Sequence, residues 1–167
     1  IISGAFAERA KLLTHICTTI FVVCLIYPVF GHWAWGHLFH FNQHGWLGKL
    51  GFIDFAGSTV VHSISGWVAL SGAFVLGPRI GKFNSDGTAN RMHGHNLPLA
   101  TIGTFFLWFG WFGFNGGSLL RADTSIGLVI INTTLSGAVS GVVVAIFGKL
   151  RNKGMDAAEI LLGIMGG

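Results

Sequence analysis

His62 is the residue whose type and position most directly suggest chemistry, because the surrounding stretch, 55–78, contains no Asp, Glu, Lys or Arg. On a helix, Ser58, His62 and Gly66 follow at intervals of four and share a narrow polar face, as a pore lining would. Eight residues beyond Asp54, His62 is expected roughly 12 Å into a hydrocarbon core of about 30 Å. A neutral imidazole offers one donor and one acceptor and can relay a proton. The alternative is a structural histidine that hydrogen-bonds a neighbouring helix.

Asp54 stands where that uncharged stretch begins. An acidic residue at a helix start usually caps the free backbone N–H groups of the first turn. Its negative charge could also attract a cation to the mouth of a pathway, and the two roles are compatible. If Asp54 only caps, replacing it with Asn should keep most activity, because Asn also caps well.

A second group of candidates combines aromatic rings with a hydroxyl. The segment 108–118 reads Trp-Phe-Gly-Trp-Phe-Gly-Phe-Asn-Gly-Gly-Ser, and within it Phe114 and Ser118 share a helix face. Trp35 lies in a shorter aromatic run, 33–36. Aromatic faces attract cations, and a hydroxyl oxygen accepts a hydrogen bond from one. The residues therefore suggest a cation-binding site, the alternative being an aromatic belt at a membrane interface.

The composition indicates that these residues are carried by membrane-spanning helices. Charged residues are 10% and apolar residues 51% of the chain, whereas a soluble domain has roughly 25% charged residues. Four intervals without any charge are each long enough for the roughly 20 residues of a span. We predict an all-α polytopic membrane protein with full spans near 12–33, 56–77, 98–119 and 125–147, a stub at 1–8 ending a preceding span and 157–167 beginning a following one.

The basic residues are divided unequally between the loops of this topology. Eight of the ten Lys and Arg residues fall on one side, and only Lys49 and Arg121 fall on the other. The positive-inside rule therefore predicts which loops are cytoplasmic, and the basic balance needs no nucleic-acid partner. The cytoplasmic loops are predicted at 8–11, 78–97 and 148–156, and the external ones at 34–54 and 120–124. Trp35, Asp54, Phe114 and Ser118 then lie at one external face, where we predict a cation-recruiting vestibule.

Two further patterns bear on packing and on cofactors. Small residues recur at helical spacing in Gly113-x-x-x-Gly117, in Gly137-x-x-x-Gly141 and in the row Ala69, Ala73 and Gly77, which favours a tightly packed bundle. Among the histidines, His37, His40 and His44 are regularly spaced, but no nearby Cys or carboxylate completes a metal-ligand set. We therefore expect no metal site and no cofactor.

The sequence resembles the ammonium transporter (Amt/Mep/Rh) family, and the Amt branch most closely. The resemblance covers 1–167 and rests on the order and spacing of four motifs. They are Ala7-Glu8-Arg9, Asp54-Phe-Ala-Gly-Ser-Thr-Val-Val-His62, His95-Asn-Leu-Pro98 and Trp108-Phe-Gly-Trp-Phe-Gly-Phe-Asn-Gly-Gly-Ser118. It implies an eleven-helix fold with inverted repeats. The chain would hold the middle of that fold, from the end of the third helix to the start of the eighth, as a partial domain truncated at both ends.

The resemblance implies a role for each candidate residue. Trp35 and Phe114 match aromatic positions that capture ammonium by cation–π contact, and Phe114 also matches one of two stacked gate phenylalanines. Ser118 matches the hydroxyl that hydrogen-bonds ammonium. Asp54 matches an acidic residue that supports the site without contact, and His62 matches the first of two paired pore histidines. The second histidine and the second gate phenylalanine would belong to helices outside this chain.

The implied function is transport of ammonium or ammonia across the cell membrane by a multi-pass protein that is not an enzyme. Ammonium would be recruited at the vestibule and deprotonated, and ammonia would cross an apolar pore containing histidine. Ammonium and methylammonium are the expected substrates. A homotrimer in the lipid bilayer and a PII-type signal protein on the cytoplasmic face are the expected partners. The alternative is an ammonium-sensing membrane domain fused to a signalling module.

Overall fold

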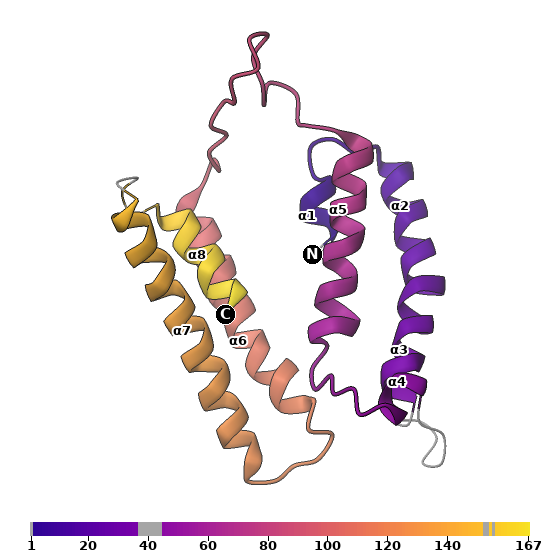
Figure 1. The fold of residues 1–167 in the computed structure, drawn as a ribbon. Helices are drawn as coiled ribbons and strands as arrows, with labels where there is room; N and C mark the ends of the chain where they lie inside the picture. The colour runs from indigo at the N-terminus through magenta and orange to yellow at the C-terminus, as the bar shows by residue number, and fades with distance from the viewer. Residues whose placement is uncertain (1, 37–44, 152–153, 155) are drawn as a thin grey trace. The chain divides into compact units, whose positions relative to one another are not determined.

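The computed structural model describes residues 2–36, 45–151, 154 and 156–167, and it divides into two compact units, Ile1–Met92 and His93–Gly167 (Figure 1). The regular structure of the described residues is helical. Unit 1 contains α1 (Ile2–Phe6), α2 (Leu12–Phe21), η1 (Val22–Ile26), α3 (Tyr27–Trp35), α4 (Trp46–Lys49), η3 (Ser58–Ser63) and α5 (Ile64–Leu76). Unit 2 contains α6 (Leu97–Gly117), α7 (Ser125–Leu150) and α8 (Ala157–Gly166).

Four helical stretches have the length and apolar composition needed to cross a membrane. They are Leu12–Trp35, Ser58–Leu76, Leu97–Gly117 and Ser125–Leu150. Each agrees with a predicted span to within three residues at either end. The all-α polytopic fold predicted from the charge-free intervals is therefore confirmed.

The first span is one continuous helix made of α2, η1 and α3, and its middle part, η1, is a π-helix. The π segment ends directly before Tyr27 and Pro28, the first two residues of α3. Proline has no N–H for the i−4 carbonyl and its ring crowds that carbonyl. A wider turn immediately before Pro28 lets the helix pass the proline without breaking.

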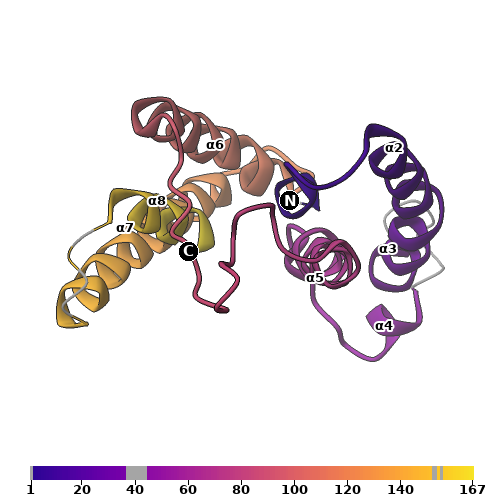
Figure 2. The same ribbon diagram turned by 90° about the horizontal axis from the view of Figure 1, so that it is seen from above.

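In unit 1, α1 packs beside α5, as both views show (Figures 1 and 2). The Phe6 ring is buried against Gly72, where an added Cβ would fall on the ring. Near the end of α5, the Arg9 guanidinium donates to the Gly77 carbonyl, and Arg79 forms a 3.0 Å ion pair with Glu8. The ends of α1 and α5 therefore lie together, as the predicted topology requires.

In unit 2, α6, α7 and α8 pack against one another (Figure 2). Gly137 and Gly141 are buried, and a Cβ at Gly137 would lie 3.3 Å from both the Trp108 ring and the Ile164 carbonyl oxygen. This confirms the close approach predicted for that small-residue row. At Gly113 and Gly117, by contrast, an added Cβ would meet no other described residue within 4 Å.

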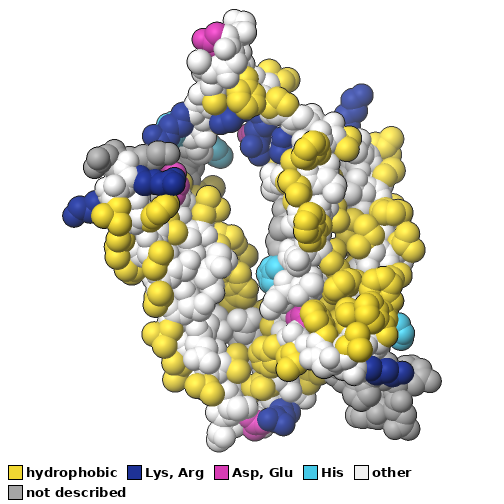
Figure 3. Space-filling view, in the orientation of Figure 1, with side chains coloured by type: hydrophobic (Ala, Val, Ile, Leu, Met, Phe, Trp, Pro, Cys, Tyr) yellow, Lys and Arg dark blue, Asp and Glu magenta, His cyan; other side chains and the backbone are white. Residues whose placement is uncertain are grey.

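Apolar side chains cover much of the outer surface of the helices (Figure 3). Phe74 and Val75 of α5 are 85% and 87% exposed, and Leu12 of α2 is 74% exposed. Apolar surface of this extent is unfavourable in water. It is typical of a surface that contacts lipid or another helix.

Candidate functional site

Trp35, the last residue of α3, is joined to the loop that precedes η3. Its indole N–H donates a 2.7 Å hydrogen bond to the backbone carbonyl of Asp54. The end of the first span and the start of the second therefore meet within unit 1. The bond also fixes the orientation of the half-buried indole ring. The backbone at Asp54 therefore determines which way the face of the ring is turned.

Asp54 caps η3 with both of its carboxylate oxygens. Oδ1 accepts from the N–H of Gly57 at 2.6 Å, and Oδ2 accepts from the N–H groups of Thr59 and Val60 at 2.9 and 2.8 Å. These are free donors of the first turn, which a carboxylate satisfies and whose dipole it complements. The capping interpretation of Asp54 is confirmed by these bonds.

The helix that carries His62 begins later and is wound differently than the sequence pattern suggests. The Gly57 carbonyl accepts from both the Val61 and the His62 N–H groups, each at 2.9 Å, which opens a π-turn. His62 therefore stands four residues after the first residue of η3, about one helical turn in, and not eight helical residues beyond Asp54. The premise of eight helical residues after Asp54 was wrong, because Phe55, Ala56 and Gly57 lie outside the helix, and the depth of His62 in the membrane stays a prediction.

The residues of the predicted polar face, Ser58, His62 and Gly66, are all exposed. One turn further on, Ser65 Oγ donates to the Val61 carbonyl at 2.6 Å, which satisfies a backbone acceptor within the wound segment. The face thus presents its polar groups at the surface of unit 1, where another helix, water or a small molecule can contact them.

The second candidate group lies at the end of α6. Ser118 Oγ donates a 2.7 Å hydrogen bond to the Phe114 carbonyl, and the Phe114 side chain is 43% exposed. A hydroxyl whose proton is used in this way still has lone pairs that can accept from a cation. Between these two residues, Asn115 Nδ2 donates to Thr133 Oγ1 of α7 at 2.9 Å and holds this end of α6 on its neighbour.

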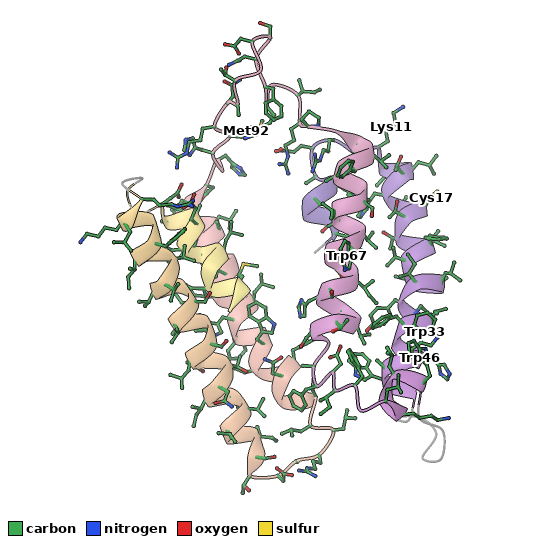
Figure 4. All side chains as sticks on the ribbon, in the orientation of Figure 1. Lys11, Cys17, Trp33, Trp46, Trp67 and Met92 are labelled. Carbon is green, nitrogen blue, oxygen red and sulfur yellow. The ribbon has the colours of Figure 1, made fainter. Side chains whose placement is uncertain are left out.

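An aromatic cluster stands next to Trp35 in unit 1. The Trp33 ring lies 5.7 Å from the Trp46 ring and 5.9 Å from the Phe30 ring, centroid to centroid. Figure 4 shows Trp33 and Trp46 together beside α4, at the opposite end of the first span from Lys11. Such a cluster is typical of the interface between lipid and water. These rings fit the interpretation as an aromatic belt, whereas the Trp35 indole is hydrogen-bonded to the Asp54 carbonyl.

Trp35, Asp54 and His62 belong to unit 1, and Phe114 and Ser118 belong to unit 2. The structure brings the first three together through the Asp54–Gly57 turn. The gathering of all the vestibule residues at one face concerns both units and stays a prediction. His37, His40 and His44, considered above for a metal site, lie outside the described residues.

Sequence reasoning missed Gly57 and the Asn115–Thr133 bond. Gly57 has φ +104°, a left-handed conformation that favours glycine. In the sequence, Gly57 is marked by its place directly before a polar Ser-Thr pair at a helix start. The Asn115–Thr133 bond joins an Asn and a Thr on two neighbouring spans, and only the packing of α6 on α7 shows that the two side chains face each other.

Comparisons with known proteins agree with this arrangement of spans and motifs. A model of the Ammonium Transporter Family matches residues 1–167. The ammonium transporter Amt2 of Archaeoglobus fulgidus is 42% identical over the whole of this chain, which covers 36% of that relative. Ammonium transporter 3 of Dictyostelium discoideum is 38% identical, again over the whole chain and 38% of the relative. The chain thus spans little more than a third of the length of these curated relatives.

Two solved structures are similar in fold as well as in sequence. The "Sensor Amt Protein" superimposes with a TM-score of 0.95 and 57% identity, over 98% of this chain and 40% of that one. Mep2 of Saccharomyces cerevisiae superimposes with a TM-score of 0.83 and 30% identity, over 98% of this chain and 35% of that one. The two curated relatives are named as ammonium transporters rather than as enzymes, and the chain is a multi-pass segment of a cell-membrane protein. It belongs to the ammonium transporter family.

Proposed function

We propose that the full-length protein transports ammonium or ammonia across the cell membrane. The observation that carries this proposal is the match of the whole chain, 1–167, to the family of ammonium transporters. The geometry of the candidate residues supports it, because each offers the chemistry that capture and deprotonation of a small cation require.

Recruitment of ammonium is assigned to Trp35, Phe114 and Ser118. An aromatic face attracts a cation and can replace part of its water shell. The Ser118 hydroxyl uses its proton on the Phe114 carbonyl, so its oxygen is an acceptor for an ammonium N–H. Asp54 contributes by holding η3 in place and by its negative charge, without touching the substrate.

Passage through the membrane is assigned to a pore lined in part by the face of His62. Moving a bare charge into hydrocarbon costs several kcal/mol or more. A cation that gives up its proton crosses as neutral ammonia and avoids most of that cost. An imidazole in an apolar pore can accept and pass on such a proton, and weak binding at the outer site allows release.

The direct test is uptake of labelled methylammonium, and of ammonium itself, by cells that lack other ammonium transporters and express the full-length protein. Saturable uptake supports transport. The second candidate function is sensing, which is raised by the similarity of this chain to the solved Sensor Amt Protein. Ammonium binding by the purified protein without any saturable flux would favour sensing over transport.

The family resemblance also supports a homotrimer and a PII-type partner. The basic loops 78–97 and 148–156 would face such a partner on the cytoplasmic side. Mass measurement of the detergent-solubilised full-length protein, alone and with a PII-type protein, tests both assemblies.

Replacing Trp35 with Leu is expected to raise the half-saturation concentration for methylammonium roughly 2- to 30-fold, because a cation–π contact contributes about 0.5–2 kcal/mol. The maximal rate should change less, since the loss concerns capture. The measurement is uptake against external concentration, normalised to protein in the membrane. An unchanged half-saturation concentration would remove Trp35 from the binding site.

Replacing His62 with Ala is expected to alter proton coupling more than the amount of protein in the membrane. Alanine can neither donate nor accept a proton, and because His62 is exposed on unit 1, the replacement removes little packing within that unit. The measurement is ammonium-evoked current and pH change in proteoliposomes containing the full-length variant. Wild-type proton-coupled current would show that His62 is structural.

A further inference from the structure

We propose that Gly57 is a positioning residue that holds the recruiting ring of Trp35 and the pore residue His62 in one fixed frame. This inference rests on the proposed transport function and extends it to a residue that touches neither substrate nor proton. It is carried by hydrogen bonds and by a close approach, all within unit 1.

The first step is a continuous path of hydrogen bonds. The Trp35 indole donates to the Asp54 carbonyl, and the Asp54 carboxylate accepts from the Gly57 N–H. The Gly57 carbonyl then accepts from the N–H of His62. Gly57 is the one residue on this path that contributes both its N–H and its C=O, so its backbone conformation sets the relation between the two ends.

The second step is the space around the Gly57 Cα atom. An added Cβ would overlap Val61 Cγ2, lie 2.9 Å from Val61 Cβ and lie 3.5 Å from Cη2 of Trp35. The indole ring and the π-turn thus both close on the position that a side chain would occupy. A methyl group there must push Val61 and the π-turn away or unwind the turn.

The η3 segment is held in place and cannot move as a whole. Val60 is 0% exposed, and it packs on Gly31 of α3, where an added Cβ would lie 3.8 Å from Val60 Cγ1. With Val60 held, the overlap of a Cβ at Gly57 falls on Val61 and on the His62 amide, whereas the Trp35 ring is in ordinary van der Waals contact and is reached through the hydrogen bonds of Asp54. Both functional ends should therefore be disturbed by one methyl group.

The test is Gly57→Ala in the full-length protein, measured by methylammonium and ammonium uptake per molecule in the membrane. We expect a several-fold rise in half-saturation concentration together with a changed ratio of methylammonium to ammonium transport. A role in stability alone would lower the maximal rate with the protein amount and would leave both of these quantities unchanged.

The matched control is Gly51→Ala. Gly51 also has a positive φ, +86°, and lies in the loop before Asp54, but an added Cβ there meets nothing within 4 Å. It carries the same kind of backbone strain without the contact to Val61 or Trp35. We expect Gly51→Ala to keep the wild-type half-saturation concentration and substrate ratio.

A second variant, Val61→Ala in the Gly57→Ala background, removes the overlapping Cγ2 atom. We expect it to bring the half-saturation concentration part of the way back, relative to Val61→Ala alone. If Gly57→Ala does not reach the membrane, the double variant is measured in its place, and altered constants relative to Val61→Ala support the proposal.

Wild-type constants in Gly57→Ala, or constants equal to those of Val61→Ala in the double variant where only that one is expressed, overturn the positioning role and leave the transport proposal intact. Equal changes in Gly57→Ala and Gly51→Ala overturn it as well, because backbone strain alone would then explain them. Absence of saturable uptake by the wild-type protein overturns the proposed function, and this inference with it.

Discussion

Replacing Asp54 with Ala is expected to abolish transport and to lower the melting temperature of the full-length protein. The substitution removes an acceptor from three backbone N–H groups at once. Loss of a helix cap costs about 0.5–2 kcal/mol, and a fully buried donor left unpaired costs about 1–3 kcal/mol, whereas these three bonds are only part-buried. We therefore expect a destabilisation of roughly 2–4 kcal/mol, measured as the melting temperature in detergent alongside methylammonium uptake.

The Asn variant does not separate the two roles of Asp54 in the way that the sequence suggests. Asp54 caps with two oxygens, one for Gly57 and one for Thr59 and Val60, whereas Asn has one oxygen and would turn an NH2 group toward a backbone donor. Asp54→Asn should therefore also lose stability and activity.

The control for this pair is Asp123→Asn. Asp123 lies in the exposed loop before α7 and accepts from the Ser125 hydroxyl and N–H, which lower the pKa of its carboxyl group, and it also pairs with Arg121. In the open loop water replaces a lost acceptor, so the melting temperature should stay near that of the wild type. An Asp54→Asn protein as stable and active as the Asp123→Asn protein would contradict both roles given to Asp54.

Replacing Gly72 with Ala is expected to disrupt the packing of α1 on α5. The new Cβ would fall on the Phe6 ring, which is 6% exposed and closely held. Overfilling a packed site costs about 1–3 kcal/mol. The melting temperature in detergent measures the loss, and the amount of protein in the membrane should fall with it.

A double-mutant cycle separates this contact from a general effect on the helix. Phe6→Ala vacates the volume, so Gly72→Ala should be far less harmful in that background than in the wild type. Gly103→Ala in α6 is the control, because an added Cβ there meets nothing within 4 Å. Additive effects of Phe6→Ala and Gly72→Ala would show that the two residues do not compete for the same space.

The sequence predicted the spans because their signal is local. A run of apolar residues between charges needs no tertiary information, and 12–33 and 56–77 were found with errors of a few residues only. The capping role of Asp54 was likewise predictable from one acidic residue at a helix start. The Glu8–Arg79 ion pair was consistent with the topology, although neither residue alone indicates its partner.

The winding of η3 was not predictable from the periodicity. A shared face for Ser58 and His62, four residues apart, assumes an α-helix, whereas Ser58–Ser63 is wound as a π-helix. The π-turn depends on one carbonyl that serves two N–H groups, which is a result of the left-handed glycine and of the packing of Val60 on α3. Tertiary contacts therefore determine that this segment is a π-helix, and Gly57 is the one residue of the sequence that indicates it.

The Arg9–Gly77 bond has a consequence for how the chain is made. Its two residues are 68 positions apart, so at about 5–20 residues per second the carbonyl of Gly77 is synthesised roughly 3–14 s after the guanidinium of Arg9. Under the positive-inside rule, the charge of Arg9 during that interval favours the cytoplasmic side for its loop. Once α5 has entered the bilayer, the same side chain becomes the cap on its last turn. The same arginine thus contributes first to the orientation of the helices and then, by its hydrogen bond, to the contact between the ends of α1 and α5.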